Sequence, residues 1–164
     1  MSDDTIYVAD SSALIEIQRK YPNDVFKTLW SKLSSLADRE IIIAPRQVLD
    51  EINRFAKEDH LRTWATAHRS IFKEPTTVHI QKVAEILARF PKLIDASSEF
   101  EQADPYVIAL ALCKDPQAKL VDKVRIVVTE EHFIRENKIP FVCGKFSVSC
   151  INTIQFFRRE GWEF

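Results

Sequence analysis

The chain has 164 residues, of which 46% are hydrophobic, so it is long enough to bury one substantial core. Its formal net charge is −1, which gives no overall positive field, so a bound polyanion would need a local basic patch or metal ions. With only 2 glycines, the chain contains neither the dinucleotide-binding fingerprint nor the P-loop fingerprint.

The cysteines and the N-terminal residues bear on the compartment. Cys113, Cys143 and Cys150 are an odd number without C-x-x-C spacing, which predicts buried free thiols in a reducing cytosol rather than disulfides or a zinc site. The first residues carry no signal-peptide pattern, and no apolar run approaches the length of a membrane span. We therefore expect a cytoplasmic protein with no membrane partner.

The hydrophobic pattern alternates between strands and helices along the chain. Strands are expected at residues 5–9, 40–45, 124–129 and 148–152. Helices are expected at 12–20, 22–38 and 45–56, across much of 58–100, from Pro105 onward, and from the last strand to about residue 159. Short apolar strands separated by helices indicate an α/β fold, in which a parallel sheet of about four to five strands is covered on both faces in three layers.

The stretch YVADSSALIEI places Asp10 where a buried strand becomes a helix. Aspartate is common as a helix cap, but Ser11 or Ser12 could cap this helix equally well. Ligands of open α/β sheets bind beyond the carboxyl ends of the strands, which is where Asp10 falls. Asp10 is therefore either a cap or a site residue.

The stretch PRQVLDEINRF follows the second strand and forms the next expected helix. At about 100° per residue, Val48, Ile52 and Phe55 cluster within roughly 40° and define a buried stripe. Glu51 falls at the edge of this stripe, whereas Asp50 points toward solvent. A charged side chain that is directed inward needs a partner or a metal, although a partly exposed Glu51 is the alternative.

Two further acidic segments lie at element boundaries. In ADPYVIALALC, Pro105 suits the first position of an almost wholly apolar helix, with Asp104 as its cap, so this helix must be central in the core. In VVTEEHF, Thr129, Glu130 and Glu131 follow the third strand, where acidic residues can also simply favour a helix dipole. Both segments could therefore face the same edge of the sheet as Asp10.

Carboxylates crowded at one edge repel each other strongly unless a cation joins them. Carboxylate oxygens are the ligands that Mg²⁺ or Mn²⁺ prefers. Such ions bind phosphate oxygens, activate water and stabilise a leaving oxygen. The pattern therefore predicts metal-assisted hydrolysis of phosphodiester bonds.

At these motifs the chain resembles the PIN domain ribonucleases, the family of the VapC toxins. VADSSALIEI, IAPRQVLDEI, ADPYVIALAL and VVTEEHF are similar to the four motifs of that family, in the same order. The resemblance implies a single PIN-like domain over residues 1–164. Residues 58–100, as a helical insert within it, are longer than in compact toxins of this type, a departure that suggests a diverged branch of the family.

The resemblance also implies roles for individual residues. By position, the catalytic and metal-binding carboxylates would be Asp10, Glu51, Asp104 and Glu131. Ser12 and Thr129 would be polar helpers that orient them. A typical member has aspartate where this chain has Glu131, and Glu130 adjoins it, so either glutamate could be the fourth acidic residue.

The function implied by the resemblance is a Mg²⁺- or Mn²⁺-dependent endoribonuclease, the toxin of a toxin–antitoxin pair, with RNA as substrate, a cognate antitoxin as partner and a homodimer as assembly. The alternative is a non-catalytic interaction module whose acidic edge binds a partner protein. A haloacid-dehalogenase-like phosphatase fits less well, because that fold usually has a second aspartate two residues after the first, where this chain has Ser12.

Basic residues after the second strand are candidates for RNA binding. Arg46 opens the helix there and could face a phosphate together with the helix N-terminus. Arg54 and Trp64 follow and could bind single-stranded RNA by charge and stacking. The alternative is that Trp64 belongs to the core of an amphipathic helix.

Overall fold

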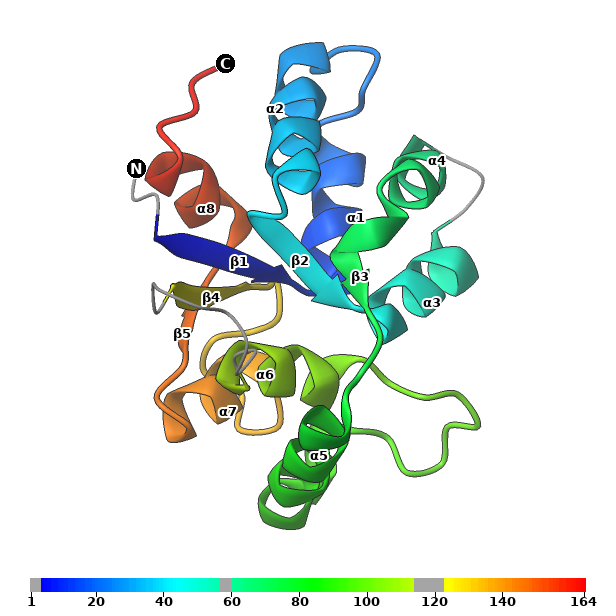
Figure 1. Ribbon diagram of the computed structural model, residues 1–164, viewed down its shortest axis with the longest axis vertical. Helices are drawn as coiled ribbons and strands as arrows, with labels where there is room; N and C mark the ends of the chain where they lie inside the picture. Colours follow the sequence, from blue (N-terminus) through cyan, green and yellow to red (C-terminus); the bar gives the residue numbers. More distant parts are fainter. Residues whose placement is uncertain (1–3, 57–59, 114–122) are drawn as a thin grey trace.

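The structure is a computed structural model that describes residues 4–56, 60–113 and 123–164 (Figure 1). Its centre is an all-parallel sheet of five strands in the order β3–β2–β1–β4–β5. The strands are β1 (Thr5–Ala9), β2 (Ile42–Pro45), β3 (Phe72–Lys73), β4 (Val124–Val128) and β5 (Ser149–Ile151). The predicted α/β fold class with about four to five parallel strands is thus confirmed.

Helices cover both faces of this sheet. The described helices are α1 (Ser11–Lys20), α2 (Lys27–Asp38), α3 (Arg46–Phe55), α4 (His60–Ala67), α5 (Thr77–Arg89), α6 (Asp104–Leu112), α7 (Ile139–Lys145) and α8 (Thr153–Arg159), with short 3₁₀ turns at Arg69–Ile71 and Pro91–Leu93. In Figure 1, α1, α2 and α8 lie above the sheet as drawn, and α5, α6 and α7 lie below it. The arrangement is a three-layer α/β/α fold, as predicted.

The core follows from the hydrophobicity of the central elements. Four of the five residues of β1 are buried, because neighbouring strands pair with it on both sides and helices cover both its faces. Helix α6 is buried on nearly every side and packs against β1, β2 and β4, which confirms its predicted central position. Its first residue is thereby held beside the sheet.

Several boundaries differ from the prediction. Helix α2 begins at Lys27 rather than residue 22, because the amides of Val25 and Phe26 turn back to the carbonyl oxygen of Pro22. Pro45 ends β2 and precedes α3 instead of beginning it. The mostly helical segment 58–100 also contributes strand β3, which pairs with the edge of β2. Residues 58 and 59 of that segment, like 1–3 and 114–122 of the predicted domain, lie outside the described residues.

The predicted burial of Phe55 is wrong. The helical periodicity places it with Val48 and Ile52, and these two are fully buried, but Phe55 is 63% exposed. Phe55 is the last residue of α3, so no further turn of the helix continues the buried stripe beyond it.

Two general expectations can be compared with the described residues. Cys113, Cys143 and Cys150 are all free, as predicted, but the predicted burial holds only for Cys143, because Cys113 and Cys150 are partly exposed. None of the described helices is both long and apolar enough to cross a membrane.

Candidate functional site

The candidate site lies at the carboxyl ends of β1 and β4, the neighbouring strands at the centre of the sheet. The chain leaves β1 toward β2 on one side, whereas β4 pairs with β1 on the other, so this is the switch point of the sheet. Ala9 pairs in register with Val128, and the amide of Asp10 donates to the carbonyl oxygen of Val128 at 2.9 Å. Asp10 and Thr129, the next residue of each segment, are therefore brought together, as predicted.

Asp10 is a buried carboxylate rather than a helix cap. It occupies the N-cap position of α1, but its side chain makes no capping hydrogen bond. Its Oδ2 instead accepts hydrogen bonds from the hydroxyls of Ser12 (2.6 Å) and Thr129 (2.9 Å). Burial raises the pKa of Asp10, and these two hydroxyls oppose that rise. Its Oδ1 is buried and has no hydrogen-bond partner among the described residues.

Glu51 points inward from α3, as its predicted helical position requires, and is 8% exposed. Its Oε1 accepts a hydrogen bond from the Ser11 hydroxyl (2.7 Å), and its Oε2 accepts one from the backbone amide of Ala103 (3.2 Å). Burial raises the pKa of Glu51, against these two donors, and the charge of Asp10 adds to the rise. Glu51 thus ties α3 to the starts of α1 and α6.

Asp104 differs from its predicted role as a cap. Ala103 occupies the N-cap position of α6, and Asp104 is the first helical residue. Asp104 is half-buried, and its pKa is raised well above the ordinary range by burial and by the negative charges of Asp10, Glu131 and Glu51. Hydrogen bonds place the four carboxylates in one neighbourhood. Ser11, next to Asp10, donates to Glu51, which also accepts from the amide next to Asp104. The Thr129 hydroxyl donates to Asp10 and accepts from the Glu131 amide.

The two adjacent glutamates after β4 have separate surroundings. Glu131 accepts a hydrogen bond from the amide of Ile139 (2.9 Å), and its amide donates to the Thr129 hydroxyl (3.1 Å). Its pKa is raised by burial and by the charge of Asp10. Glu130 turns the other way, where its Oε1 accepts hydrogen bonds from the amide of Thr153 (2.8 Å) and from the Thr153 hydroxyl. Glu131 is therefore the fourth carboxylate of the cluster, and Glu130 is tied to the start of α8.

The cluster has no counter-charge in direct contact. Among the described residues, no lysine or arginine forms an ion pair with Asp10, Glu51, Asp104 or Glu131. Lys138 acts on Asp104 and Glu131, and Arg54 acts on Glu51, only as more distant charges. The described ranges contain no group of three or more acidic, histidine or cysteine side chains that is already arranged to hold a metal ion.

The donor chemistry nevertheless fits a divalent cation. The four side chains offer only carboxylate oxygens, which suit Mg²⁺ or Mn²⁺. A buried oxygen without a hydrogen-bond donor, such as Oδ1 of Asp10, is a group that a bound cation would satisfy. To coordinate one ion together, the carboxylates would have to draw closer than they lie here.

The predicted RNA-binding residues have three different surroundings. Trp64 is 4% exposed and donates its indole N–H to Ser34, so the alternative that it belongs to the core is confirmed. The guanidinium of Arg46 is surrounded by carboxylates, namely Asp50, Glu74 and Glu101. Arg54, unlike Arg46, has no carboxylate in direct contact within the described part of the chain, and its guanidinium instead lies over the ring of Phe100.

Sequence reasoning missed several side chains that support the site. Ser11 was considered only as a cap, but it donates to Glu51, a contact 40 residues apart in sequence. Gln47 is 1% exposed and donates from Nε2 to Glu101 (2.7 Å), and its Oε1 has no partner in the described residues. Its position four residues before Glu51, on the same helical face, is the one signal that could have identified it.

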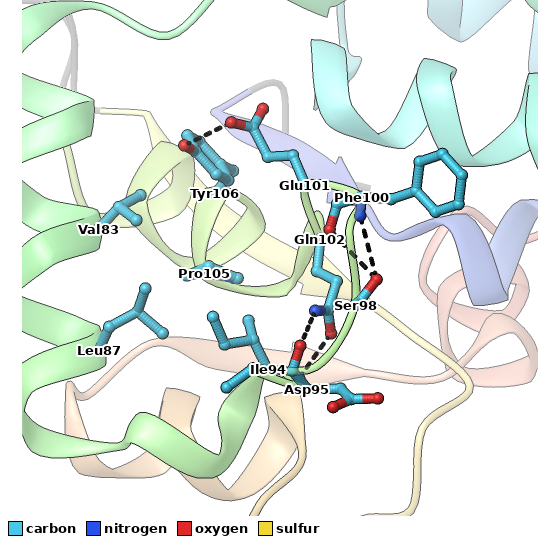
Figure 2. A pocket seen from close by; sticks show the side chains of 11 residues that line it. Val83, Leu87, Ile94, Asp95, Ser98, Phe100, Glu101, Gln102, Pro105 and Tyr106 are labelled. Carbon is cyan, nitrogen blue, oxygen red and sulfur yellow. Dashed lines mark hydrogen bonds between the residues drawn. The ribbon is translucent and has the colours of Figure 1, made fainter.

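A cleft of 190 Å³ lies beside this site, between α5, the start of α6 and the segment before α6. Figure 2 shows Val83 and Leu87 on one side of the cleft and Gln102 and Asp95 on the other. None of the four clustered carboxylates lines it. The cleft is therefore separate from the acidic cluster.

Comparison with known proteins identifies one family. No curated protein and no solved structure matches the chain significantly. One family model, described as a domain of unknown function (DUF4411), matches residues 7–164, a range that includes the whole acidic cluster. The chain therefore belongs to the DUF4411 family.

Proposed function

We propose that this protein is a divalent-metal-dependent endoribonuclease whose reaction site is formed by Asp10, Glu51, Asp104 and Glu131. The observation that carries the proposal is the gathering of these four carboxylates at the switch point of the sheet, where no lysine or arginine of the described residues pairs with them. A fold gains no stability from buried like charges, so a positively charged ligand is the best explanation for their presence together.

Mg²⁺ or Mn²⁺ is the ligand that suits this donor set. Asp10, with its unpartnered Oδ1, would hold the ion together with Asp104, and Glu51 and Glu131 would complete the acidic surroundings. A bound divalent ion supplies Lewis-acid stabilisation of phosphate oxygens and activation of water, the chemistry that phosphodiester hydrolysis needs.

The protein's own contribution is to fix the orientation of these carboxylates. The hydroxyls of Ser12 and Thr129 hold Oδ2 of Asp10, which leaves its Oδ1 available. The Ser11 hydroxyl and the Ala103 amide hold both oxygens of Glu51, and the Ile139 amide holds one oxygen of Glu131. Such outer contacts preset ligands before the metal arrives and tune its affinity.

RNA as the substrate rests on the resemblance of the four motifs to PIN domain ribonucleases. The same resemblance supports a toxin role, a cognate antitoxin and a homodimer. The three-layer parallel fold is compatible with all three. We therefore include these as parts of the proposal, and the metal-dependent cleavage of a phosphodiester as its core.

The experiment compares variants for cleavage of a labelled single-stranded RNA of mixed sequence with Mg²⁺, Mn²⁺ or EDTA. We expect Asp10→Asn and Glu51→Gln each to lower the cleavage rate by about 1000-fold or more, because metal-ion catalysis contributes several kcal/mol. Asp50→Asn is the matched control, since Asp50 neighbours Glu51 but pairs with Arg46. Circular dichroism checks that each variant is folded.

Two results would reject the nuclease. One is cleavage that persists in EDTA or in folded Asp10→Asn. The other is a wild-type protein that cleaves no RNA with either ion but binds a partner protein through the acidic cluster, which would establish the interaction module instead.

A further inference from the structure

Two exposed phenylalanine rings next to the acidic cluster lie against one arginine. Phe55 is 63% exposed and Phe100 is 50% exposed. The guanidinium carbon of Arg54 lies 4.1 Å from the ring centroid of Phe100 and 5.2 Å from that of Phe55. We call Arg54, Phe55 and Phe100 the stacking platform, because a planar cation and two aromatic rings are brought together at the surface.

The segment that carries Phe100 is held in place at both ends. Gln102 closes it, because its Nε2 donates to the carbonyl oxygen of Asp95 (2.8 Å) and its Oε1 accepts from the Asp95 amide (2.9 Å). Glu101 is fixed by hydrogen bonds from Gln47 (2.7 Å) and Tyr106 (3.2 Å). In Figure 2 the Phe100 ring points away from the cleft side chains Val83 and Leu87. The exposure of Phe100 is therefore built into the segment.

The platform adjoins the acidic cluster through both of its elements. Arg54 and Phe55 lie about one helical turn after Glu51 on α3, and the charge of Arg54 lowers the pKa of Glu51. Phe100 lies three residues before Ala103, whose amide donates to Glu51. A strand of substrate at the cluster would therefore reach the platform within its neighbouring nucleotides.

We propose that the stacking platform binds a base of single-stranded RNA whose backbone enters the acidic cluster, an inference that rests on the proposed function. Aromatic rings with an arginine bind unpaired bases by stacking and cation–π contact, whereas bases in a duplex are already stacked on their neighbours. Arg54 has no carboxylate in contact within the described residues, so its charge remains for a phosphate that the cluster would otherwise repel. The exposed aromatic ring beside Arg54 is thus that of Phe100, whereas Trp64 is buried in the core.

The test measures binding of a fluorescently labelled single-stranded RNA by anisotropy in EDTA, so that no cleavage occurs. Phe100→Ala is expected to weaken binding by about 5- to 100-fold, the range for loss of one base–aromatic stack, and Phe100→Trp is expected to retain it. Arg54→Gln should weaken binding and lower the salt slope by about 0.7, the value for one phosphate contact on a single strand. Phe164→Ala, which removes a phenylalanine of 56% exposure far from the cluster in sequence, is the control and should bind like wild type.

Several outcomes overturn the platform. Wild type and Phe100→Ala could bind RNA equally well, a matched duplex could bind more tightly than the single strand, or no RNA could bind at all. Alternatively, Phe100→Ala could dissociate a dimer without changing the RNA affinity, which would assign the surface to a second copy of the chain. Because the assay needs no metal, the two proposals can fail separately. Phe100-dependent binding without cleavage rejects the nuclease, and cleavage without Phe100-dependent binding rejects the platform.

Discussion

Polar side chains at the two ends of β1 differ in how completely the fold pairs them. In its first half, the Tyr7 hydroxyl donates to Glu160 at 2.6 Å, and Arg159 donates to the Thr5 hydroxyl at 3.0 Å. The Tyr7 ring also packs edge-on against Phe156, with 4.6 Å between the ring centroids. These contacts satisfy each of the named groups within the fold, and they support stability.

At the carboxyl end of β1, four carboxylates meet, and the described residues supply only neutral hydrogen-bond donors to them. Asp10 receives hydroxyl hydrogen bonds on one oxygen and none on the other. Burial and mutual repulsion raise the pKa of Asp104. The difference teaches that polar burial at one end completes the fold, whereas at the other end it leaves negative charge that a proton or a cation would relieve.

The largest expected effect is that variants at the two ends of β1 change the free energy of unfolding in opposite directions. In EDTA, Asp10→Asn should raise the free energy of unfolding by about 1 kcal/mol, because a neutral amide removes a buried like charge. Tyr7→Phe should lower it by about 1–2 kcal/mol, because Glu160 loses its donor. Urea unfolding followed by circular dichroism measures both. Loss of stability in Asp10→Asn would break the comparison.

A smaller effect is expected at the hydroxyl that orients Asp10. Ser12→Ala should lower the metal-dependent cleavage rate by about 10- to 100-fold and raise the Mn²⁺ concentration needed for half-maximal rate. The reason is that the Ser12 hydroxyl holds Oδ2 of Asp10 and accepts the amide hydrogen of Glu130. Ser31→Ala, an exposed serine of α2, provides the control. An unchanged metal dependence in Ser12→Ala would mean that Ser12 only supports the fold.

The smallest expected effect is a pH dependence of stability without metal. The pKa values of Asp10, Glu51, Asp104 and Glu131 are all raised in the folded state. Above the ordinary carboxyl pKa of about 4, the folded state therefore binds more protons than the unfolded state, so stability is highest at low pH and falls as pH rises through the raised values.

One variant tests whether Asp104 contributes to this fall in stability with rising pH. As pH rises above the ordinary carboxyl pKa, we expect wild type in EDTA to lose more stability than Asp104→Asn, which has one fewer carboxyl group with a raised pKa. Urea midpoints at several pH values provide the measurement. The same pH slope in both proteins would show that Asp104 does not take part in the cluster.

The sequence could predict the parts of the site that local periodicity controls. Asp10 and Thr129 follow apolar strands whose carboxyl ends share one edge, and Glu51 faces inward because of its angle on α3. Contacts between distant segments decided the rest. The choice between Glu130 and Glu131 depends on Thr153, which binds Glu130.

Local patterns were misleading where tertiary packing or the end of an element intervened. Phe55 continues the apolar stripe of α3 in sequence, but the helix ends there and the ring is exposed. Trp64 lies among basic residues, but it packs against Trp30 and is buried. Phe100 lies in a segment without clear periodicity, so only the structure could place it on Arg54.

The most direct test of the central claim is calorimetric titration of the metal-free protein with Mn²⁺. The account predicts saturable binding to wild type and to Asp50→Asn, and loss of that binding in Asp10→Asn and in Asp104→Asn. Equal Mn²⁺ binding in all four proteins, or none in the wild type, would contradict a cation site formed by the clustered carboxylates.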